Sequence, residues 1–241
     1  MNTNHADNLV KSKERIQKHG EVFTPHWVVN DMLDLLPAEV WQPKKTFLEP
    51  ACGEGAFLIE IFRRKLQNIV STTLNNHSTT LDQQSKWEWQ TAIATSSIYG
   101  IELLEDNAQR CKENLLRVFT TSYNKHFPNS QEKEFTKTIG FLIERNIIQG
   151  NALTYRKCKL SCGNECKKCK LIIFSEWSPV SENNEHFFIR KDYTYEGIIN
   201  TEQMRESASG GLFADEFSND EYGLVKKYRP VNFKKIRYAT N

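Results

Sequence analysis

The sequence contains no apolar run long enough to cross a membrane, and its first residues, MNTNHADNLVKSKERIQKHG, are too polar for a signal peptide. It also lacks a strong charge of either sign, because 32 Lys and Arg side chains are balanced by 30 Asp and Glu side chains. The formal net charge of +2 therefore neither favours nor excludes a nucleic acid as a partner. We expect a soluble cytoplasmic protein that does not associate with a membrane.

Internal repeats are absent as well, and 241 residues are enough to bury one good core. Strand-like and helix-like segments alternate along the chain, which favours an α/β fold with a doubly wound sheet. We expect a polar and basic segment over residues 1–19 and a single domain over residues 20–241. Residues 67–90 are rich in Asn, Gln, Ser and Thr and predict a polar surface insertion in that domain.

The predicted elements begin with a helix after Thr24-Pro25, with Thr as N-cap and Pro at the first helical position. Its apolar residues are expected on one face: Val28, Val29, Met32, Leu33 and Leu36. Further helices are predicted over about 56–66 and after Leu103, where apolar residues recur at spacings of three and four. Four strands are predicted at Thr46–Pro50, Ile98–Leu103, Arg145–Leu153 and Lys170–Phe174.

The dinucleotide fingerprint G-x-G-x-x-G is missing, but FLEPACGEGAFLIEI (Phe47 to Ile61) contains a closer pair of glycines. A strand is expected to end at Glu49-Pro50, and a turn with Gly53 and Gly55 leads into a helix. Glycine lets the backbone approach a ligand, and the helix N-terminus offers unpaired N–H groups and partial positive charge. The motif favours a nucleotide-type pocket, and an ordinary turn that needs glycine for its dihedral angles is the alternative.

Three more segments accompany this motif: GEVFTP before it, then IYGIEL and NIIQGNAL after it. In this order and spacing the four segments resemble the amino-terminal half of the S-adenosylmethionine-dependent adenine-N6 DNA methyltransferases, as in type I and type IIG modification enzymes. The resemblance implies a Rossmann-like methyltransferase sheet, S-adenosylmethionine as cofactor and DNA as partner. It implies that the cofactor is held by Phe23, Thr24 and Pro25 at its methionine end, by Glu49, Pro50, Ala51, Gly53 and Gly55 around its amino-acid portion, by Glu102 at the ribose and by Asn151 at the adenine.

Two positions depart from the family pattern. Asn151 stands where the family usually has Asp, so its contact with the adenine amino group would lack charge and be weaker. The family's catalytic Asn/Asp-Pro-Pro-aromatic motif, which holds a flipped-out adenine, occurs nowhere in the chain. The fourth strand, KLIIF, is followed by SEWSP, and Pro179 is expected to end its ladder. By position alone, Ser175, Glu176 and Trp177 are the catalytic candidates; alternatively, Glu176 is a solvated acid and Trp177 a packing residue.

Four of the six cysteines fall within residues 157–170, KCKLSCGNECKKCK. In a cytoplasmic protein this density favours metal over disulfides, and four thiolates suffice for a structural zinc site. A loop of reduced thiols is the alternative. The neighbouring lysine side chains would balance the negative charge of the thiolates or bind phosphate. The predicted zinc ligands are Cys158, Cys162, Cys166 and Cys169.

The basic and aromatic stretch KKYRPVNFKKIRY near the end of the sequence suits a nucleic-acid backbone or a charged edge strand equally well. We expect an adenine-specific DNA methyltransferase, the modification subunit of a restriction–modification system. We expect no room for a large target-recognition domain after Pro179. Sequence specificity would then come from a separate specificity or restriction subunit or from the cysteine-rich loop, or be absent. The alternatives are an inactive cofactor- and DNA-binding partner subunit, or a methyltransferase of this fold that acts on RNA, protein or a small molecule.

Overall fold

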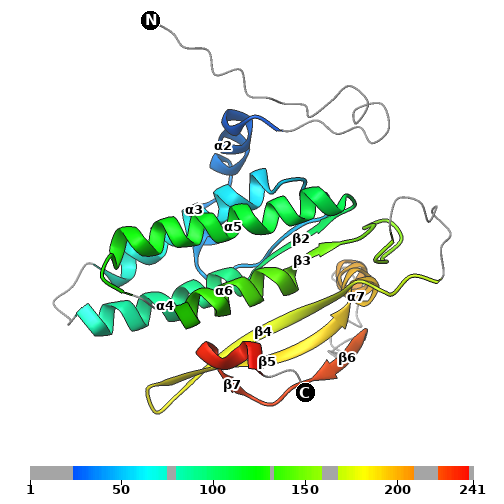
Figure 1. Cartoon of the computed structure of the whole chain (residues 1–241). Coiled ribbons are helices and arrows are strands. Elements are labelled where there is room, and N and C mark those ends of the chain that lie inside the picture. Colours follow the sequence, from blue (N-terminus) through cyan, green and yellow to red (C-terminus); the bar gives the residue numbers. More distant parts are fainter. Residues whose placement is uncertain (1–23, 75–79, 131–132, 159–167, 209–221, 239–241) are drawn as a thin grey trace, which may run out of the picture.

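The computed structural model describes residues 24–74, 80–130, 133–158, 168–208 and 222–238 (Figure 1). The predicted segment 1–19 and Phe23 of the predicted cofactor site lie outside these ranges. None of the helices in the described ranges has the length and apolar character that a membrane crossing requires. The elements are, in chain order, α2 (His26–Asp34), η1 (Ala38–Trp41), β1 (Phe47–Glu49), α3 (Ala56–Thr73), α4 (Thr80–Ser96), β2 (Ile98–Glu102), α5 (Glu105–His126), α6 (Lys133–Asn146), β3 (Ile147–Gln149), β4 (Ile173–Glu182), β5 (Glu185–Thr194), α7 (Tyr195–Ala208), β6 (Leu224–Lys227), β7 (Val231–Asn232) and η3 (Phe233–Tyr238).

The first three strands form a parallel sheet in the order β1-β2-β3. Leu48 of β1 stands beside Tyr99 of β2, and Ile101 of β2 stands beside Ile148 of β3. The central strand β2 is buried along almost its whole length, as its apolar sequence requires. Since all three strands run in the same direction, their carboxyl ends meet at one edge of the sheet.

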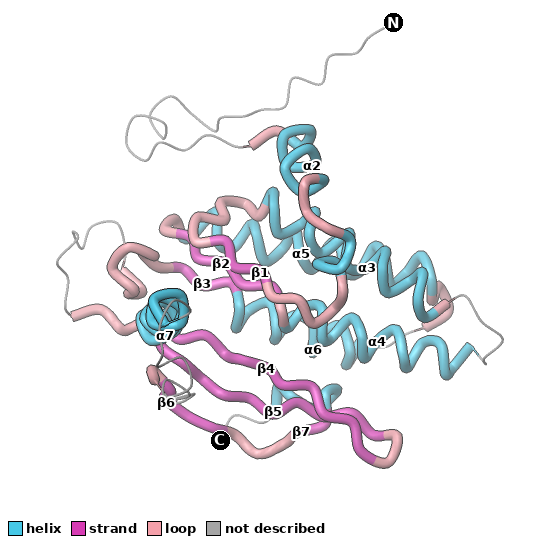
Figure 2. The backbone as a smooth tube through the Cα atoms, turned by 180° about the vertical axis from the view of Figure 1, so that it is seen from behind, coloured by secondary structure: helices cyan, strands magenta, loops and turns pink. Residues whose placement is uncertain are grey.

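Both faces of this sheet are covered, which gives the α/β character that the sequence predicts. Helices α3 and α5 lie on one side of the sheet. Helix α6, which contacts β2 and β3, lies on the other side, where the start of β4 and α7 also pack (Figures 1 and 2). On the second face, Ile101 and Ile148 pack with Phe174 and Tyr195. Both faces of the sheet are therefore packed against other elements.

The prediction that KLIIF forms a fourth strand ending before Pro179 was wrong in two respects. β4 belongs to a second sheet of order β4-β5-β6, with β7 also paired to β5. It runs antiparallel to β5 from Ile173 to Glu182, and Pro179 stands opposite Phe188 within the ladder. Because β4 is an edge strand in the described part of the chain, the proline, which has no N–H to donate, is tolerated there.

The segment 67–90, predicted as a polar surface insertion, is helical over residues 67–73 and 80–90. α3 continues to Thr73, beyond the expected end near residue 66, and α4 begins at Thr80. Trp87 of α4 is fully buried and packs against the rings of Phe119, Tyr123 and Phe127. The polar composition misled the prediction because a few large apolar residues are enough to anchor a helix in the core.

Helix α2 also differs from its prediction. Pro25, rather than Thr24, is the N-cap residue, and no side chain caps the helix. Only Val29 and Leu33 are buried, whereas Met32 and Leu36 of the expected apolar face are exposed. The buried side of α2 faces α3, so the helix covers one flank of the core.

Candidate functional site

The glycine motif forms the turn between β1 and α3 at the carboxyl edge of the parallel sheet. Gly53 and Gly55 both have positive φ angles, +54° and +93°, and Gly55 is the N-cap residue of α3. The turn is tied to β2 by the Cys52 N–H, which donates to the Ile101 carbonyl at 2.9 Å. An L side chain rarely adopts these φ angles, which explains why glycine occupies both positions.

Glu102, the last residue of β2, holds this turn from the neighbouring strand. Its Oε2 accepts a hydrogen bond from the Gly53 N–H at 2.8 Å, and its Oε1 accepts one from the Leu104 N–H at 2.8 Å. The side chain is 8% exposed. A carboxylate has about four acceptor positions, so two backbone bonds orient Glu102 and leave acceptor capacity for a ligand.

The described chain leaves open space beside Gly53. Apart from the glycine and its two chain neighbours, no atom of the described residues lies within 4 Å of a Cβ placed on Gly53. The first turn of α3 contains no acidic side chain, so nothing there neutralises the positive end of the helix dipole. Glu49, by contrast, turns back on the loop, where its Oε1 accepts from the Ala51 N–H at 3.3 Å.

Two thiols fill the space beneath the turn. Cys52 and Cys111 of α5 are both buried, and a hydrogen bond between the two thiols together with burial strongly raises the pKa of Cys52. A Cβ on Gly55 would lie 2.7 Å from the Cys111 sulfur. Glycine is therefore required at position 55 for close packing as well as for its φ angle.

The remaining predicted cofactor residues are distributed around this edge. Asn151 lies just after β3, and its side-chain oxygen accepts from the Leu153 N–H at 2.9 Å, closing a local turn. Thr24 and Pro25 stand at the start of α2, which an ion pair between Asp34 and Arg64 of α3 holds at 2.7 Å. Glu49, the glycines and Glu102 are thus brought together, while no recorded contact joins Thr24 or Pro25 to the glycine turn.

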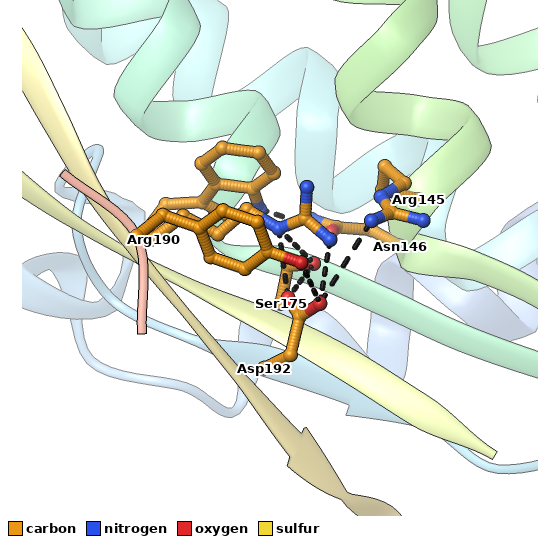
Figure 3. Close-up of polar contacts among 7 residues, drawn as sticks. Arg145, Asn146, Ser175, Arg190 and Asp192 are labelled. Carbon is orange, nitrogen blue, oxygen red and sulfur yellow. Dashed lines mark hydrogen bonds and ion pairs between the residues drawn. The ribbon is translucent and has the colours of Figure 1, made fainter. Parts of the chain in front are cut away.

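The three catalytic candidates point in two directions. Ser175 and Trp177 are buried on the face of β4 that meets α6, where Ser175 Oγ donates to Asp192 at 2.7 Å and Trp177 Nε1 donates to Asn146 at 3.3 Å (Figure 3). Glu176 is exposed and stands opposite Lys191 of β5. The structure therefore separates Glu176 from its two neighbours.

A buried ion pair dominates the network around Ser175. Arg190 donates to both carboxylate oxygens of Asp192, at 2.7 and 2.6 Å, and Tyr228 adds a further hydrogen bond at 3.0 Å. Burial alone would raise the pKa of Asp192, but the hydrogen bonds from Arg190 and Ser175 lower it. Sequence reasoning missed this pair, although Arg190 and Asp192 alternate with Phe188 along one strand, a spacing that places all three on one face.

The cysteine-rich stretch is described only in part, because Cys162 and Cys166 lie outside the described residues. Cys158 is buried and Cys169 is half-buried, and backbone pairing between their segments brings them toward each other. In the described part of the chain, no group of three or more potential metal ligands comes together. The zinc site therefore stays a prediction.

The basic stretch near residue 230 divides into internal and exposed cations. Lys234 pairs with the buried Glu88 of α4 at 2.6 Å, and Arg237 pairs with Glu134 of α6. Lys226, Lys227 and Arg229 are exposed, with no carboxylate partner recorded in the described ranges. Lys226 and Lys227 on the short edge strand β6, with Arg229 just beyond it, fit the charged-edge interpretation.

Comparison with known proteins identifies the family that this arrangement belongs to. The family model described as "MmeI, DNA-methyltransferase domain" matches residues 32–205, well over half of the chain. No curated protein and no solved structure matched. The matched residues include the glycine turn, Glu102, Asn151 and β4. The chain therefore belongs to the MmeI DNA-methyltransferase domain family.

Proposed function

We propose that the protein binds S-adenosylmethionine at the carboxyl edge of the parallel sheet and methylates adenine N6 in DNA. This proposal rests on one observation: Glu102 lies beside the glycine turn and the N-terminus of α3. When bound, S-adenosylmethionine supplies an electrophilic methyl group on a positively charged sulfur. A Rossmann-like methyltransferase fold agrees with the parallel order β1-β2-β3 and with the family.

The residues at this edge suit the parts of the cofactor. The backbone N–H groups at the start of α3 attract its carboxylate, because the helix dipole is positive there. Glu102 accepts hydrogen bonds from the ribose hydroxyls with its remaining lone pairs. The open space beside Gly53 lets the cofactor approach the backbone closely. Asn151 lies where the adenine is expected, with its side-chain oxygen already engaged by Leu153.

We propose, as a second candidate, that the chain binds cofactor and DNA while a partner polypeptide supplies the base-holding residues. The burial of Ser175 and Trp177 favours this function, because neither side chain reaches solvent to meet an extruded base. β1 also has no partner strand on its outer side in the described residues, and Leu48 there is 38% exposed. An open strand edge is a surface on which a second chain can continue the sheet.

Calorimetry with S-adenosylmethionine tests the pocket, and transfer of a tritiated methyl group to unmethylated genomic DNA tests the activity. Binding together with transfer supports the methyltransferase, and binding without transfer supports the partner-dependent function. Absence of binding at millimolar cofactor contradicts both. Within an active enzyme, loss of methyl transfer in Glu176→Ala but not in Trp177→Phe would assign a catalytic role to Glu176.

We further propose that the cysteines of residues 157–170 bind structural zinc. The pairing that brings Cys158 and Cys169 toward each other supports two of the four ligands. Elemental analysis of the purified protein is expected to find about one zinc per chain. Zinc content that stays unchanged in Cys158→Ser and Cys169→Ser would count against the site.

A further inference from the structure

We propose that Lys157, Lys168 and Lys170, called here the lysine cluster, bind phosphates of the DNA backbone beside the ends of β2 and β3. The inference rests on the proposed function, because it assigns the surface that meets the DNA substrate. It differs from that function in naming side chains outside the cofactor site. All three side chains are exposed.

The backbone forces two of these charges together. Arg156 pairs antiparallel with Leu171, and the Lys157 N–H donates to the Lys170 carbonyl at 2.9 Å. Lys157 and Lys170 therefore stand opposite each other on adjacent segments. Like charges directly opposite each other destabilise such a pairing, and an anion bound between them relieves that repulsion.

The carboxylates of the described chain do not neutralise this repulsion. Glu144 attracts Lys157, but it already forms an ion pair with Lys112 at 2.6 Å. No ion pair is recorded for any member of the lysine cluster with the described residues. The site is thus built for an anion from outside this part of the chain, and a phosphodiester matches its charge.

The lysine cluster also lies at the correct edge of the sheet. Gln149, the last residue of β3, donates from Nε2 to the carbonyls of Leu103 and Cys158, at 2.9 and 3.0 Å. Leu103 directly follows Glu102, so these bonds join the lysine-bearing segment to the candidate cofactor site. In Figure 1 the segment after β3 extends beyond the ends of β2 and β3. A base that enters the site from DNA brings its flanking phosphates to this position.

A second set of cations provides a matched control. Lys226, Lys227 and Arg229 are equally exposed, but they belong to the edge strand β6 and its continuation, where charge protects the edge. Neutralising either set removes three positive charges from the protein. A difference in DNA affinity between the two triple variants therefore results from the position of the charges rather than from the net charge.

The test measures the affinity of the full chain for a fluorescent DNA duplex by anisotropy over a range of salt concentrations. For the variant Lys157→Gln, Lys168→Gln, Lys170→Gln we expect affinity at low salt to fall at least about tenfold, and the slope of log affinity against log salt to fall by about 3. The variant Lys226→Gln, Lys227→Gln, Arg229→Gln is expected to bind nearly as the natural protein does. S-adenosylmethionine affinity and zinc content are measured on all three proteins and are expected to be equal.

Two results would overturn the inference: equal loss of DNA affinity in both triple variants, or unchanged affinity in the lysine-cluster variant. A loss of DNA affinity accompanied by lower zinc content or a lower melting temperature would also overturn the inference. The lysines would then stabilise the fold or the zinc-bound thiolates rather than bind DNA. If the natural protein fails to bind DNA at low salt while binding the cofactor, the proposed DNA substrate fails together with the inference.

Discussion

Glu102 and Gly53 are 49 residues apart, yet the Gly53 N–H donates to the Glu102 carboxylate at 2.8 Å. The bond joins the end of β2 to the turn that opens α3. The side chain that we expect to hold the ribose is thus the same one that fixes the glycine turn.

Replacement of this carboxylate is expected to weaken cofactor binding. Glu102→Gln removes the charge and one of the acceptor groups for the Gly53 and Leu104 N–H groups. We expect S-adenosylmethionine affinity to fall by about 2 kcal/mol, or roughly thirtyfold, the usual cost of a charged hydrogen bond. Calorimetry measures the change. Glu113→Gln on the exposed side of α5 is the control, and an equal loss there would contradict the assignment.

Replacing glycine by alanine is expected to have opposite effects on stability at positions 55 and 140. In Gly55→Ala the new Cβ meets the Cys111 sulfur at 2.7 Å at a φ of +93°, so the turn must shift. We expect a destabilisation of about 1–3 kcal/mol and loss of cofactor binding. Gly140→Ala lies within α6 with no atom of the described chain near its Cβ, and is expected to stabilise by up to about 1 kcal/mol. Urea unfolding compares them, and equal effects would refute the role of the turn.

The ion pair between Glu88 and Lys234 is expected to stabilise the packing of α4 against η3. Glu88 is fully buried and also accepts hydrogen bonds from Gln84 and Tyr123. Lys234→Met leaves this carboxylate without its cation, and we expect the free energy of unfolding to fall by about 2–3 kcal/mol. Urea denaturation measures it against the exposed neighbour Lys235→Met. The expectation fails if both variants lose the same amount.

Lys65 predicts how stability changes with pH. Its Nζ is fully buried and donates to the carbonyls of Pro43 and Lys45 and to the Ser97 hydroxyl, at 2.9, 2.5 and 2.8 Å. Burial lowers the pKa of Lys65 from 10.5 to about 7. Between these two values the unfolded chain binds a proton that the folded protein has released, so stability rises with pH across this window.

The rise is measured by urea unfolding between about pH 7.5 and 9, and it cannot exceed about 1.4 kcal/mol per pH unit. Lys65→Met removes the titrating group, so its stability should be lower and flat over this range. Lys86→Met, an exposed position on α4, should keep the slope of the natural protein. A natural protein whose stability stays constant from pH 7.5 to 9 would contradict the lowered pKa.

Short stretches of the sequence were enough to predict the part of the fold that contains the candidate site. The strand, glycine turn and helix from Phe47 onward are encoded in consecutive residues, as are β2 with Glu102 and the buried face of α5. Each of these depends on the properties of neighbours in sequence. That is why the position of Glu102 at a strand end was predictable before its bond to Gly53 was known.

The second sheet was missed because its pairing depends on the hairpin that follows β4. Asn183 and Asn184 have φ angles of +49° and +62°, which is the two-residue turn that joins antiparallel strands. Their presence in the sequence was a usable signal for β4 and β5. The sequence left Trp177 as either a catalytic candidate or a packing residue, because its hydrogen bond to Asn146 depends on contact between distant segments.

The contact between Cys52 and Cys111 allows opening of the glycine turn to be measured by chemical modification of a thiol. A thiol that is buried and whose pKa is raised reacts slowly with alkylating reagents, since the thiolate is the reactive form. Modification of Cys52, located by mass spectrometry of peptides, therefore requires that the glycine turn separate from α5. Its rate measures how often the turn opens, and a ligand seated on the turn would slow it without touching either sulfur.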